Sequence, residues 1–183
     1  MKTNLTSARL AFPALFTAKT MQNSDSAKFG ASLIVAADDK QIKTINEVIE
    51  TVAKEKWGAK AADVLKQLRA SDKVCLHNGD VKAAYDGFAG NFFISATNSV
   101  RPLVVDKDKS PLTEADGKPY SGCYVNAVLE IWAQDNQFGK RINATLMGVQ
   151  FVKDGEAFGG GGRPADVSDF DDISSGADAE ALV

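Results

Sequence analysis

The chain has 183 residues, of which 44% are hydrophobic and 25% are charged, and its 24 acidic and 21 basic residues give a formal net charge of −3. These values are ordinary for a water-soluble globular protein, and the length suits one domain of about 150 residues followed by a tail. No stretch approaches the ~20 apolar residues that a membrane-spanning helix needs, so no membrane partner is expected.

The first third of the chain predicts two strands. Residues 5–20 are interpreted as an extended segment in which Leu10 and Phe12 share one face, and Pro13 marks a bulge or an edge position. Residues 28–36 alternate as a second strand, because apolar side chains recur at every second position. The residues expected on one side of it are Phe29, Ala31, Leu33 and Val35.

A helical insertion is expected after the second strand. Apolar residues recur there at helical spacing over residues 40–57, and a shorter helical pattern covers residues 61–68. The stripe of the longer helix consists of Ile42, Ile45, Ile49, Val52 and Ala53. Residues 72–90 have no such period and are expected to form a loop.

The second half of the chain predicts three more strands, at residues 91–99, 124–134 and 141–152, arranged as a meander. Residues 102–120 are rich in proline, glycine, lysine and aspartate and are expected to be a turn-rich connection. The whole order indicates a mostly β fold, a small antiparallel barrel of five strands, partly open and interrupted by the helical insertion.

The chain ends in an acidic tail. A run of four glycines, Gly159–Gly162, is interpreted as a hinge, so the folded domain is expected to span residues 1–158 and the hinge with its disordered tail residues 159–183. The last twenty residues contain six acids, no base and one large aromatic residue, Phe170. Residues 1–163 therefore carry 18 acids against 21 bases, about +3. This separation indicates either a polyanion-binding body with a built-in competitor or a tail that only aids solubility.

Catalytic and metal chemistry find little support. The single histidine, His77, lies near Cys75, but no further ligands follow at a recognisable spacing, and no nucleophile–base pair is apparent. Cys75 and Cys123 form neither a disulfide framework nor a CxxC pair, which favours a reducing cytoplasmic setting. No Lys-Ser or Lys-Thr follows the glycine run, so it is not a phosphate loop. We therefore expect a protein that is not an enzyme and has no metal and no cofactor.

Large aromatic residues on the polar faces of the predicted strands favour a binding function. An exposed ring at such a position could stack on nucleobases, and lysines and arginines nearby could follow a phosphate backbone. The candidate stacking residues are Phe93, Tyr120, Tyr124 and Trp132. The candidate phosphate ligands are Arg101, Lys107, Lys140 and Arg141. In the alternative interpretation the helical insertion covers these rings and turns them into a second small core.

Several motifs, taken in order, resemble a family of bacteriophage single-stranded DNA-binding proteins with an OB-type barrel. They are ARLAFPALFTAKT, KFGASLIVA, EKWG, YSGCYVNAVLEIWAQDN, VQFVKDGEAFGGGGR and the acidic DVSDFDDI. The resemblance covers residues 8–173, and its most specific part is YSGCY at 120–124 together with the KDGE and glycine-rich ending.

The resemblance implies an OB-fold protein that coats exposed single-stranded DNA during phage replication and recombination, in the cytoplasm of an infected bacterium. It also implies that the tail competes with DNA and docks phage or host replication proteins, with Asp169, Phe170, Asp171 and Asp172 as the docking residues. This chain departs from the common bacterial pattern, because thirteen residues follow Phe170 and the aromatic residue is not terminal.

Two rival functions stay open at this point. One is an RNA-binding OB protein, and the other is a protein-interaction module that binds no nucleic acid. The sequence leaves the oligomeric state open, and it does not tell whether residues 102–120 fold over the binding surface.

Overall fold

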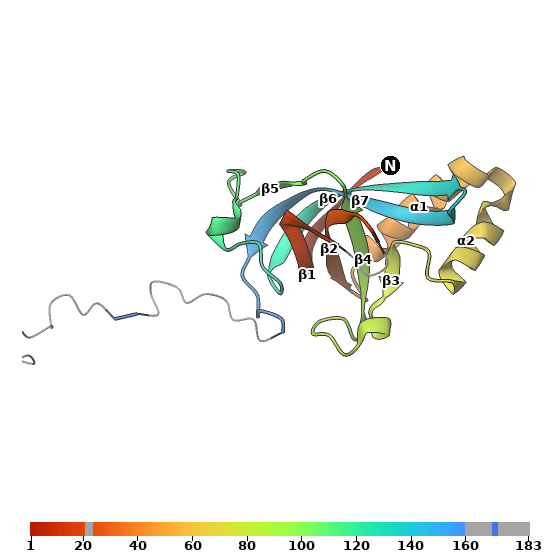
Figure 1. Cartoon of the computed structure of the whole chain (residues 1–183). Coiled ribbons are helices and arrows are strands. Elements are labelled where there is room, and N and C mark those ends of the chain that lie inside the picture. The colour runs from red at the N-terminus through yellow and green to blue at the C-terminus, as the bar shows by residue number, and fades with distance from the viewer. Residues whose placement is uncertain (21–23, 160–169, 172–183) are drawn as a thin grey trace, which may run out of the picture.

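A computed structural model describes residues 1–20, 24–159 and 170–171 of the chain. Five strands form a closed barrel (Figure 1). They are β1 (Lys2–Thr20), β2 (Ala27–Ala36), β4 (Asn91–Asn98), β6 (Tyr124–Asn136) and β7 (Gly139–Lys153). The long hairpin of β6 and β7 and the pairs β1–β2, β1–β6 and β2–β4 are antiparallel. The predicted mostly β fold with a five-stranded barrel is thus confirmed.

The barrel closes where β4 meets β7. This pair is parallel, with Thr97 opposite Thr145, and Asn98 Nδ2 donates a hydrogen bond to the carbonyl oxygen of Leu146 at 2.9 Å. The predicted meander is wrong in this respect, because β4 pairs with β2 and β7 and has no ladder with β6. Sequence alternation defines the face of a strand, but the choice of partner depends on where the helical insertion returns the chain.

The core follows the alternation of the strands. On β6 the inward side chains Val125, Ala127, Leu129 and Ile131 occupy every second position and are 0–2% exposed. Full burial of a valine, leucine or isoleucine side chain contributes about 1.5–3 kcal/mol to the stability of the folded state. The two faces of a barrel strand therefore differ sharply, and the outward face is left for binding or for a second layer.

A helical insertion follows β2, as predicted, and packs against the barrel. It comprises α1 (Gln41–Trp57) and α2 (Ala61–Ala70), joined by one 3-10 turn, Gly58–Lys60. The stripe of α1 packs into the main core through Ile45 and Ile49, which are 1% and 0% exposed. Trp57 Nε1 donates to Asp135 Oδ2 at 2.8 Å, so the end of α1 is joined to the tip of the β6–β7 hairpin.

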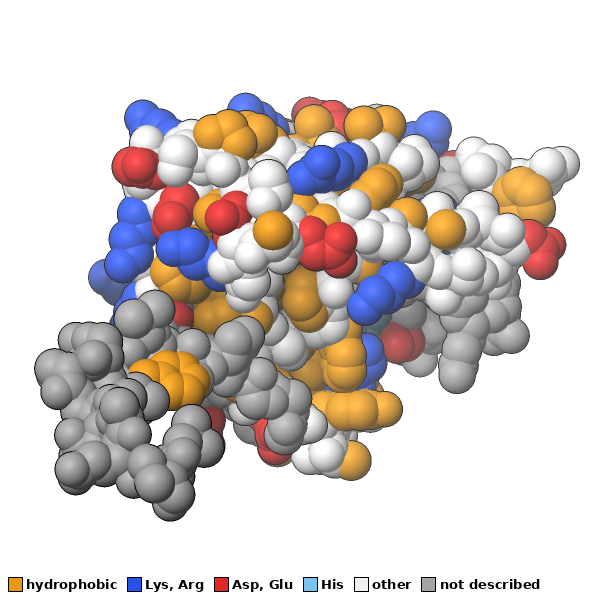
Figure 2. All heavy atoms as spheres, turned by 60° about the vertical axis from the view of Figure 1, so that its left-hand side comes forward, with side chains coloured by type: hydrophobic (Ala, Val, Ile, Leu, Met, Phe, Trp, Pro, Cys, Tyr) orange, Lys and Arg blue, Asp and Glu red, His pale blue; other side chains and the backbone are white. Residues whose placement is uncertain are grey.

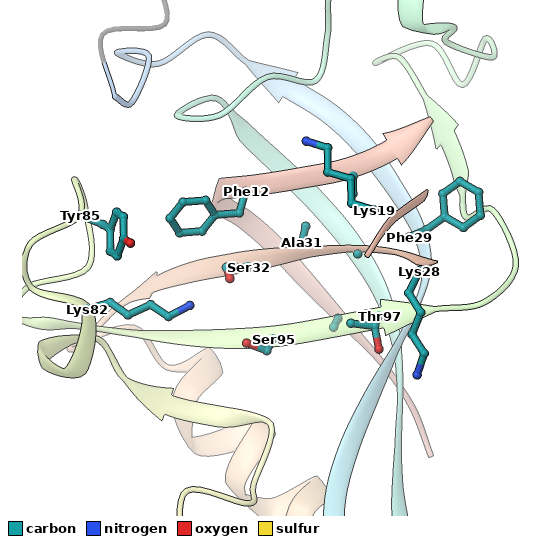
Figure 3. Close-up of a pocket in the computed structure, with 13 residues that line it drawn as sticks. Phe12, Lys19, Lys28, Phe29, Ala31, Ser32, Lys82, Tyr85, Ser95 and Thr97 are labelled. Carbon is teal, nitrogen blue, oxygen red and sulfur yellow. The ribbon is translucent and has the colours of Figure 1, made fainter. Parts of the chain in front are cut away.

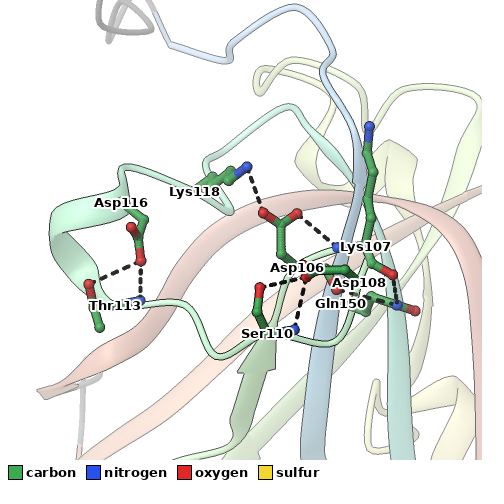
Figure 4. Close-up of polar contacts among 8 residues, drawn as sticks. All are labelled: Asp106, Lys107, Asp108, Ser110, Thr113, Asp116, Lys118 and Gln150. Atoms are coloured by element: carbon green, nitrogen blue, oxygen red, sulfur yellow. Dashed lines mark hydrogen bonds and ion pairs between the residues drawn. The ribbon is translucent and has the colours of Figure 1, made fainter.

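Residues 102–120 form a folded connection beside β7. It contains β5 (Leu103–Val105), which runs parallel to β7, and a 3-10 turn at Glu114–Asp116. Asp106 accepts a hydrogen bond from Lys118 Nζ at 2.8 Å and another from the backbone N–H of Lys107, and Gln150 on β7 donates to the carbonyl oxygen of Lys107 (Figure 4). These contacts hold the connection on the barrel wall.

Residues 72–90, predicted to be a loop, contain two short elements. They are β3 (Leu76–Asn78), which pairs with β4, and a 3-10 turn, Gly79–Lys82. Among the described residues, no helix is both long enough and apolar enough to span a membrane.

Candidate nucleic-acid interface

A groove with a volume of about 480 Å³ crosses the outer face of β1, β2 and β4 (Figure 3). Its lining consists of the aromatic residues Phe12, Phe29 and Tyr85, the lysines Lys19, Lys28 and Lys82, and a floor of the small residues Ala14, Gly30, Ala31, Ser32, Ser95, Ala96 and Thr97. Figure 3 shows Phe12, Tyr85 and Lys82 gathered at one end, with Lys28 and Phe29 toward the other. We call this hollow the groove.

A β-bulge presents Phe12 to the groove. The register of β1 against β2 shifts between Ala11 and Ala14, and Phe12 has a φ of +48°, a left-handed conformation that is unusual for a bulky residue. Its side chain is 50% exposed, whereas that of Leu10 is fully buried. The bulge at Pro13 was predicted, but the shared face of Leu10 and Phe12 is wrong, because an extra residue in a strand reverses the side chains beyond it.

Tyr85 and Lys82 reach the groove from residues 79–90, which we call the groove loop. The loop is pinned by Phe88, which is 1% exposed in a small core with Ala11, Ile34 and Phe93. Asp80 Oδ1 also accepts the backbone N–H of Gly90 at 2.8 Å, which ties the two ends of the loop together. The ring of Tyr85 then meets that of Phe12 edge-on, with centroids 5.1 Å apart.

The electrostatic character of the groove is cationic. No acidic side chain is among its lining residues, and within the described part of the chain its three lysines form no salt bridge. Lys82 Nζ lies 5.0–5.6 Å from the ring centroids of Phe12, Phe88 and Phe93. Lys19 and Lys28 are direct cross-strand partners, an arrangement that is unfavourable without a counter-charge.

Hydrophobic side chains reach the surface in several places on the face drawn in Figure 2, with lysine and arginine side chains between them. Such interleaving of apolar and basic groups is typical of protein surfaces that bind single-stranded nucleic acid, because bases stack on aromatic rings and phosphates pair with cations.

Phe93, predicted to be an exposed stacking ring, is buried. It is 2% exposed, lies in the small core under Phe88, and stacks on the His77 ring at a centroid distance of 4.9 Å. The prediction of exposure is wrong, since the groove loop covers this end of β4. For Phe93 the alternative interpretation, a second small core, is therefore correct. The groove loop, and not the helical insertion, covers this core.

The other predicted rings lie outside the groove lining. Tyr120 donates to Asp154 Oδ1 at 2.7 Å, and burial raises the pKa of its hydroxyl, with a further contribution from Asp154. Tyr124 is half-buried, and its ring centroid lies 5.7 Å from Arg9 Cζ and 4.7 Å from Lys153 Nζ. Trp132 is 40% exposed and donates to Thr145 Oγ1 at 3.0 Å, in a shallow hollow beside α1.

The four predicted phosphate ligands are spread over the barrel. Arg101 follows the end of β4, and its guanidinium lies 5.3 Å from the Phe16 ring. Lys107 is in the connection beside β7, Lys140 pairs with Asp135 at 3.2 Å at the hairpin tip, and Arg141 is exposed next to it. None of the eight predicted DNA-binding residues lines the groove. Arg101 lies shortly after β4, one of the strands that form the floor of the groove.

A second hollow of about 420 Å³ adjoins the groove and shares Phe12, Lys19 and Tyr85 with it. Gly159 lines this hollow, so the described range 24–159 ends beside the groove. Of the predicted docking residues, Phe170 and Asp171 are exposed, while Asp169 and Asp172 lie outside the described residues.

Sequence reasoning missed the residues that line the groove. Lys19 and Lys28 stand near the facing ends of two predicted neighbouring strands, so the assumption of a hairpin would have paired them. Phe12 next to Pro13 signalled a bulge and hence a reversed ring. No signal of this kind existed for Tyr85 and Lys82, because a loop without a period cannot be placed from its sequence.

Metal binding has no geometric support in the described residues, which contain no group of three or more His, Cys, Asp or Glu side chains able to hold an ion. His77 Nδ1 lies 2.6 Å from Asp72 Oδ1, and its ring packs on Phe93. Both cysteines are buried, and desolvation raises the pKa of Cys75 to about 12 and that of Cys123 to about 11.

The strand order β4-β2-β1-β6-β7, closed by β4 and β7, defines an OB-type barrel, and the groove lies on the face of the second and third barrel strands where OB folds take their ligands. The family described as the single-stranded DNA-binding protein of Enterobacter phage Enc34 matches residues 1–182, and the chain belongs to this family.

Individual proteins are also similar to this chain. A relative called putative protein p50, from Acyrthosiphon pisum secondary endosymbiont phage 1, is 44% identical over 185 residues, which cover 100% of this chain and 99% of the relative. The single-stranded DNA-binding protein of bacteriophage Enc34, solved in complex with single-stranded DNA, is 28% identical with a TM-score of 0.72, covering 86% of this chain and 89% of that one.

The single-stranded DNA-binding protein gp2.5 of bacteriophage T7 has a TM-score of 0.56 at 12% identity, with 83% of this chain and 91% of that one covered. At this identity the likeness concerns the fold alone.

Proposed function

We propose that this chain is a sequence-independent single-stranded DNA-binding protein that holds the strand in the groove. One observation carries the proposal: three aromatic rings and three lysines, with no acidic side chain, line a groove on the ligand-binding face of an OB barrel. The Enc34 relative solved with single-stranded DNA supports it.

Base stacking supplies the sequence-tolerant part of the affinity. Phe12 is exposed and held in a left-handed backbone conformation, and Tyr85 is 55% exposed beside it, so both rings are pre-positioned for bases. Each stacked base is worth roughly 1–3 kcal/mol, and every base has a face to offer. The floor of serine, threonine, alanine and glycine leaves room for bases of either size.

Phosphate neutralisation supplies the salt-dependent part. Lys19, Lys28 and Lys82 face the groove, and a phosphate near the Lys19–Lys28 pair would relieve the repulsion between them. Arg101, beyond the end of β4, extends the cationic path in this proposal. Duplex DNA is a poor ligand, since its bases already stack on each other.

The biological role that follows is the coating of exposed strands during phage DNA replication and recombination. Family membership supports this role, and binding without chemistry agrees with the lack of a nucleophile–base pair in the sequence. We propose a binding protein and not an enzyme.

The acidic tail is proposed to compete with DNA for the groove and to dock phage or host replication proteins. Gly159 lines the hollow next to the groove, and six acids with one aromatic residue follow within the last twenty residues. A tethered anion beside a cationic groove competes best at low salt, where screening is weak.

The experiment is an anisotropy titration of labelled oligo-dT, the matching duplex and oligo-U, at several salt concentrations. Tight oligo-dT binding that weakens with salt and spares the duplex is the expected result. Equal or tighter binding of oligo-U would favour an RNA-binding protein, because RNA recognition also uses the 2′-hydroxyl. No binding at low salt, with or without the tail, would refute the proposal and leave a protein-interaction module.

A further inference from the structure

The residues that follow β7 run tightly along the barrel before the tail begins. Residues 154–159, which we call the strap, lie against the turn at 120–122. Gly155 N donates to the Tyr120 hydroxyl at 3.2 Å, and Arg9 donates to the carbonyl oxygen of Glu156 at 2.9 Å. A Cβ on Gly122 would come within 2.2 Å of that same oxygen, so only glycine fits the turn, whose φ of +104° also favours it.

This packing explains why YSGCY and KDGE occur together in the sequence. Tyr120 and Gly122 of the first motif contact Asp154, Gly155 and Glu156 of the second. The two motifs are one structural unit that directs the end of the chain toward the groove loop.

The strap ends on the groove loop. Phe158 packs against the small core of Ala11, Ile34, Phe88 and Phe93, and its ring lies so close to Gly87 that a Cβ there would be 2.6 Å from Phe158 Cζ.

The Phe158 ring and the residue after it make further contacts. The Arg9 guanidinium lies 4.3 Å from the centroid of the Phe158 ring. Gly159 N donates to Asp86 Oδ2 at 3.1 Å, and Asp86 is the neighbour of Tyr85.

We propose that Phe158 is a positioning residue for single-stranded DNA: it holds the groove loop so that Tyr85 and Lys82 face the groove. Phe158 is absent from the lining of the groove itself and acts through the loop. The inference rests on the proposed function, and it gives the strap a role separate from that of the acidic tail, which begins beyond it.

The test compares Phe158→Ala with Phe158→Leu in the full chain, because leucine keeps much of the apolar volume against Gly87 while alanine leaves it empty. Leu112→Ala is the matched control, since Leu112 is 6% exposed in the main core and belongs to the connection beside β7. It reports a general loss of stability without touching the groove loop. Oligo-dT affinity and backbone hydrogen exchange of residues 79–90 are measured for each variant.

We expect Phe158→Ala to weaken oligo-dT binding about tenfold, the loss of roughly one stacked ring, and to speed hydrogen exchange in the groove loop. Phe158→Leu is expected to recover most of both, and Leu112→Ala to leave both near the original values. Combining Phe158→Ala with Tyr85→Ala is expected to weaken binding by less than the product of the two separate losses, because both changes remove the Tyr85 ring from the groove and Phe158→Ala adds only the displacement of Lys82.

Unchanged affinity in Phe158→Ala would overturn the inference, as would losses that multiply in the double variant with slow exchange retained in the loop. Should the unaltered chain bind no oligo-dT, the proposed function fails, but the exchange measurement still decides whether Phe158 holds the loop.

Discussion

The ring of Phe12 meets the ring of Tyr85 edge to face, with centroids 5.1 Å apart and planes at 88°. This contact joins a bulge in β1 to the groove loop, two segments separated by more than seventy residues. The pair marks the boundary between the groove and the hollow beside it, since both residues line both. The rings proposed to stack on bases are therefore this pair, and none of the four rings that the sequence predicted lines the groove.

Phe12→Ala and Tyr85→Ala are each expected to weaken oligo-dT binding by about 5- to 160-fold, the range that 1–3 kcal/mol per stacked base implies. Anisotropy titration at fixed salt measures the loss. Trp132→Ala is the matched control, because Trp132 is exposed but lies beside α1, away from the groove. A large loss in the Trp132 variant with none in the other two would place the DNA on a different surface.

Lys82→Ala is expected to make binding less dependent on salt. With about four phosphate contacts, the logarithm of the affinity should fall against the logarithm of salt concentration with a slope near −3, and loss of one contact should reduce the slope by about 0.7. Lys140→Ala should leave the slope unchanged, because Lys140 is paired with Asp135 at the hairpin tip. The reverse result would assign the phosphate contacts to the hairpin.

Deletion of residues 164–183 is expected to tighten oligo-dT binding, most strongly at low salt. The deletion removes the six acidic residues of the tail and leaves residues 1–163, whose net charge is about +3. A full-length variant with these acids replaced by their amides serves as the control, since it keeps the length and removes only the charge. If the deletion tightens binding and the amide variant does not, bulk and not charge is responsible. Unchanged affinity across salt in both would leave the tail as a partner site or a solubility device.

Both cysteines are expected to resist alkylation in the folded protein. Burial raises the pKa of Cys75 to about 12 and of Cys123 to about 11, so at pH 8 few thiolates form and reagent cannot reach them. Mass spectrometry after iodoacetamide treatment should find no modification in buffer and two modifications in denaturant. Rapid labelling of either cysteine in buffer would contradict the packing around it.

The pair of Asp106 and Lys118 is expected to stabilise the protein above pH 4 and to lose that effect in acid. The hydrogen bond from Lys118 holds the pKa of Asp106 below its ordinary 3.8, so stability is lost as pH falls through the lowered value. The Tm of Asp106→Asn should therefore lie below that of the original protein at pH 6, and the gap between them should narrow as the pH falls below 3.8. A gap that stays constant over this range would show that Asp106 acts by packing and not by charge.

Much of the barrel could be predicted from periodicity. The inward face of β6, the stripe of α1 and the bulge near Pro13 all follow from local spacing, because strands repeat every two residues and helices every 3.6. The predicted strand pairing was wrong, because β4 pairs with β2 and β7 and not with β6. Partners of a strand are chosen by the path of the whole chain, about which local spacing says nothing.

The candidate site shows the same division. The sequence alone determined a mostly β body with a helical insertion and an acidic tail, and through its motifs it pointed to a family that binds single-stranded DNA. Only the tertiary structure decided that Phe93 is buried, that the Phe12 ring faces outward, and that Tyr85 and Lys82 cross to the groove. Exposure of a ring depends on which distant segment covers it, and here that segment is the groove loop, held in place from its far side by Phe158.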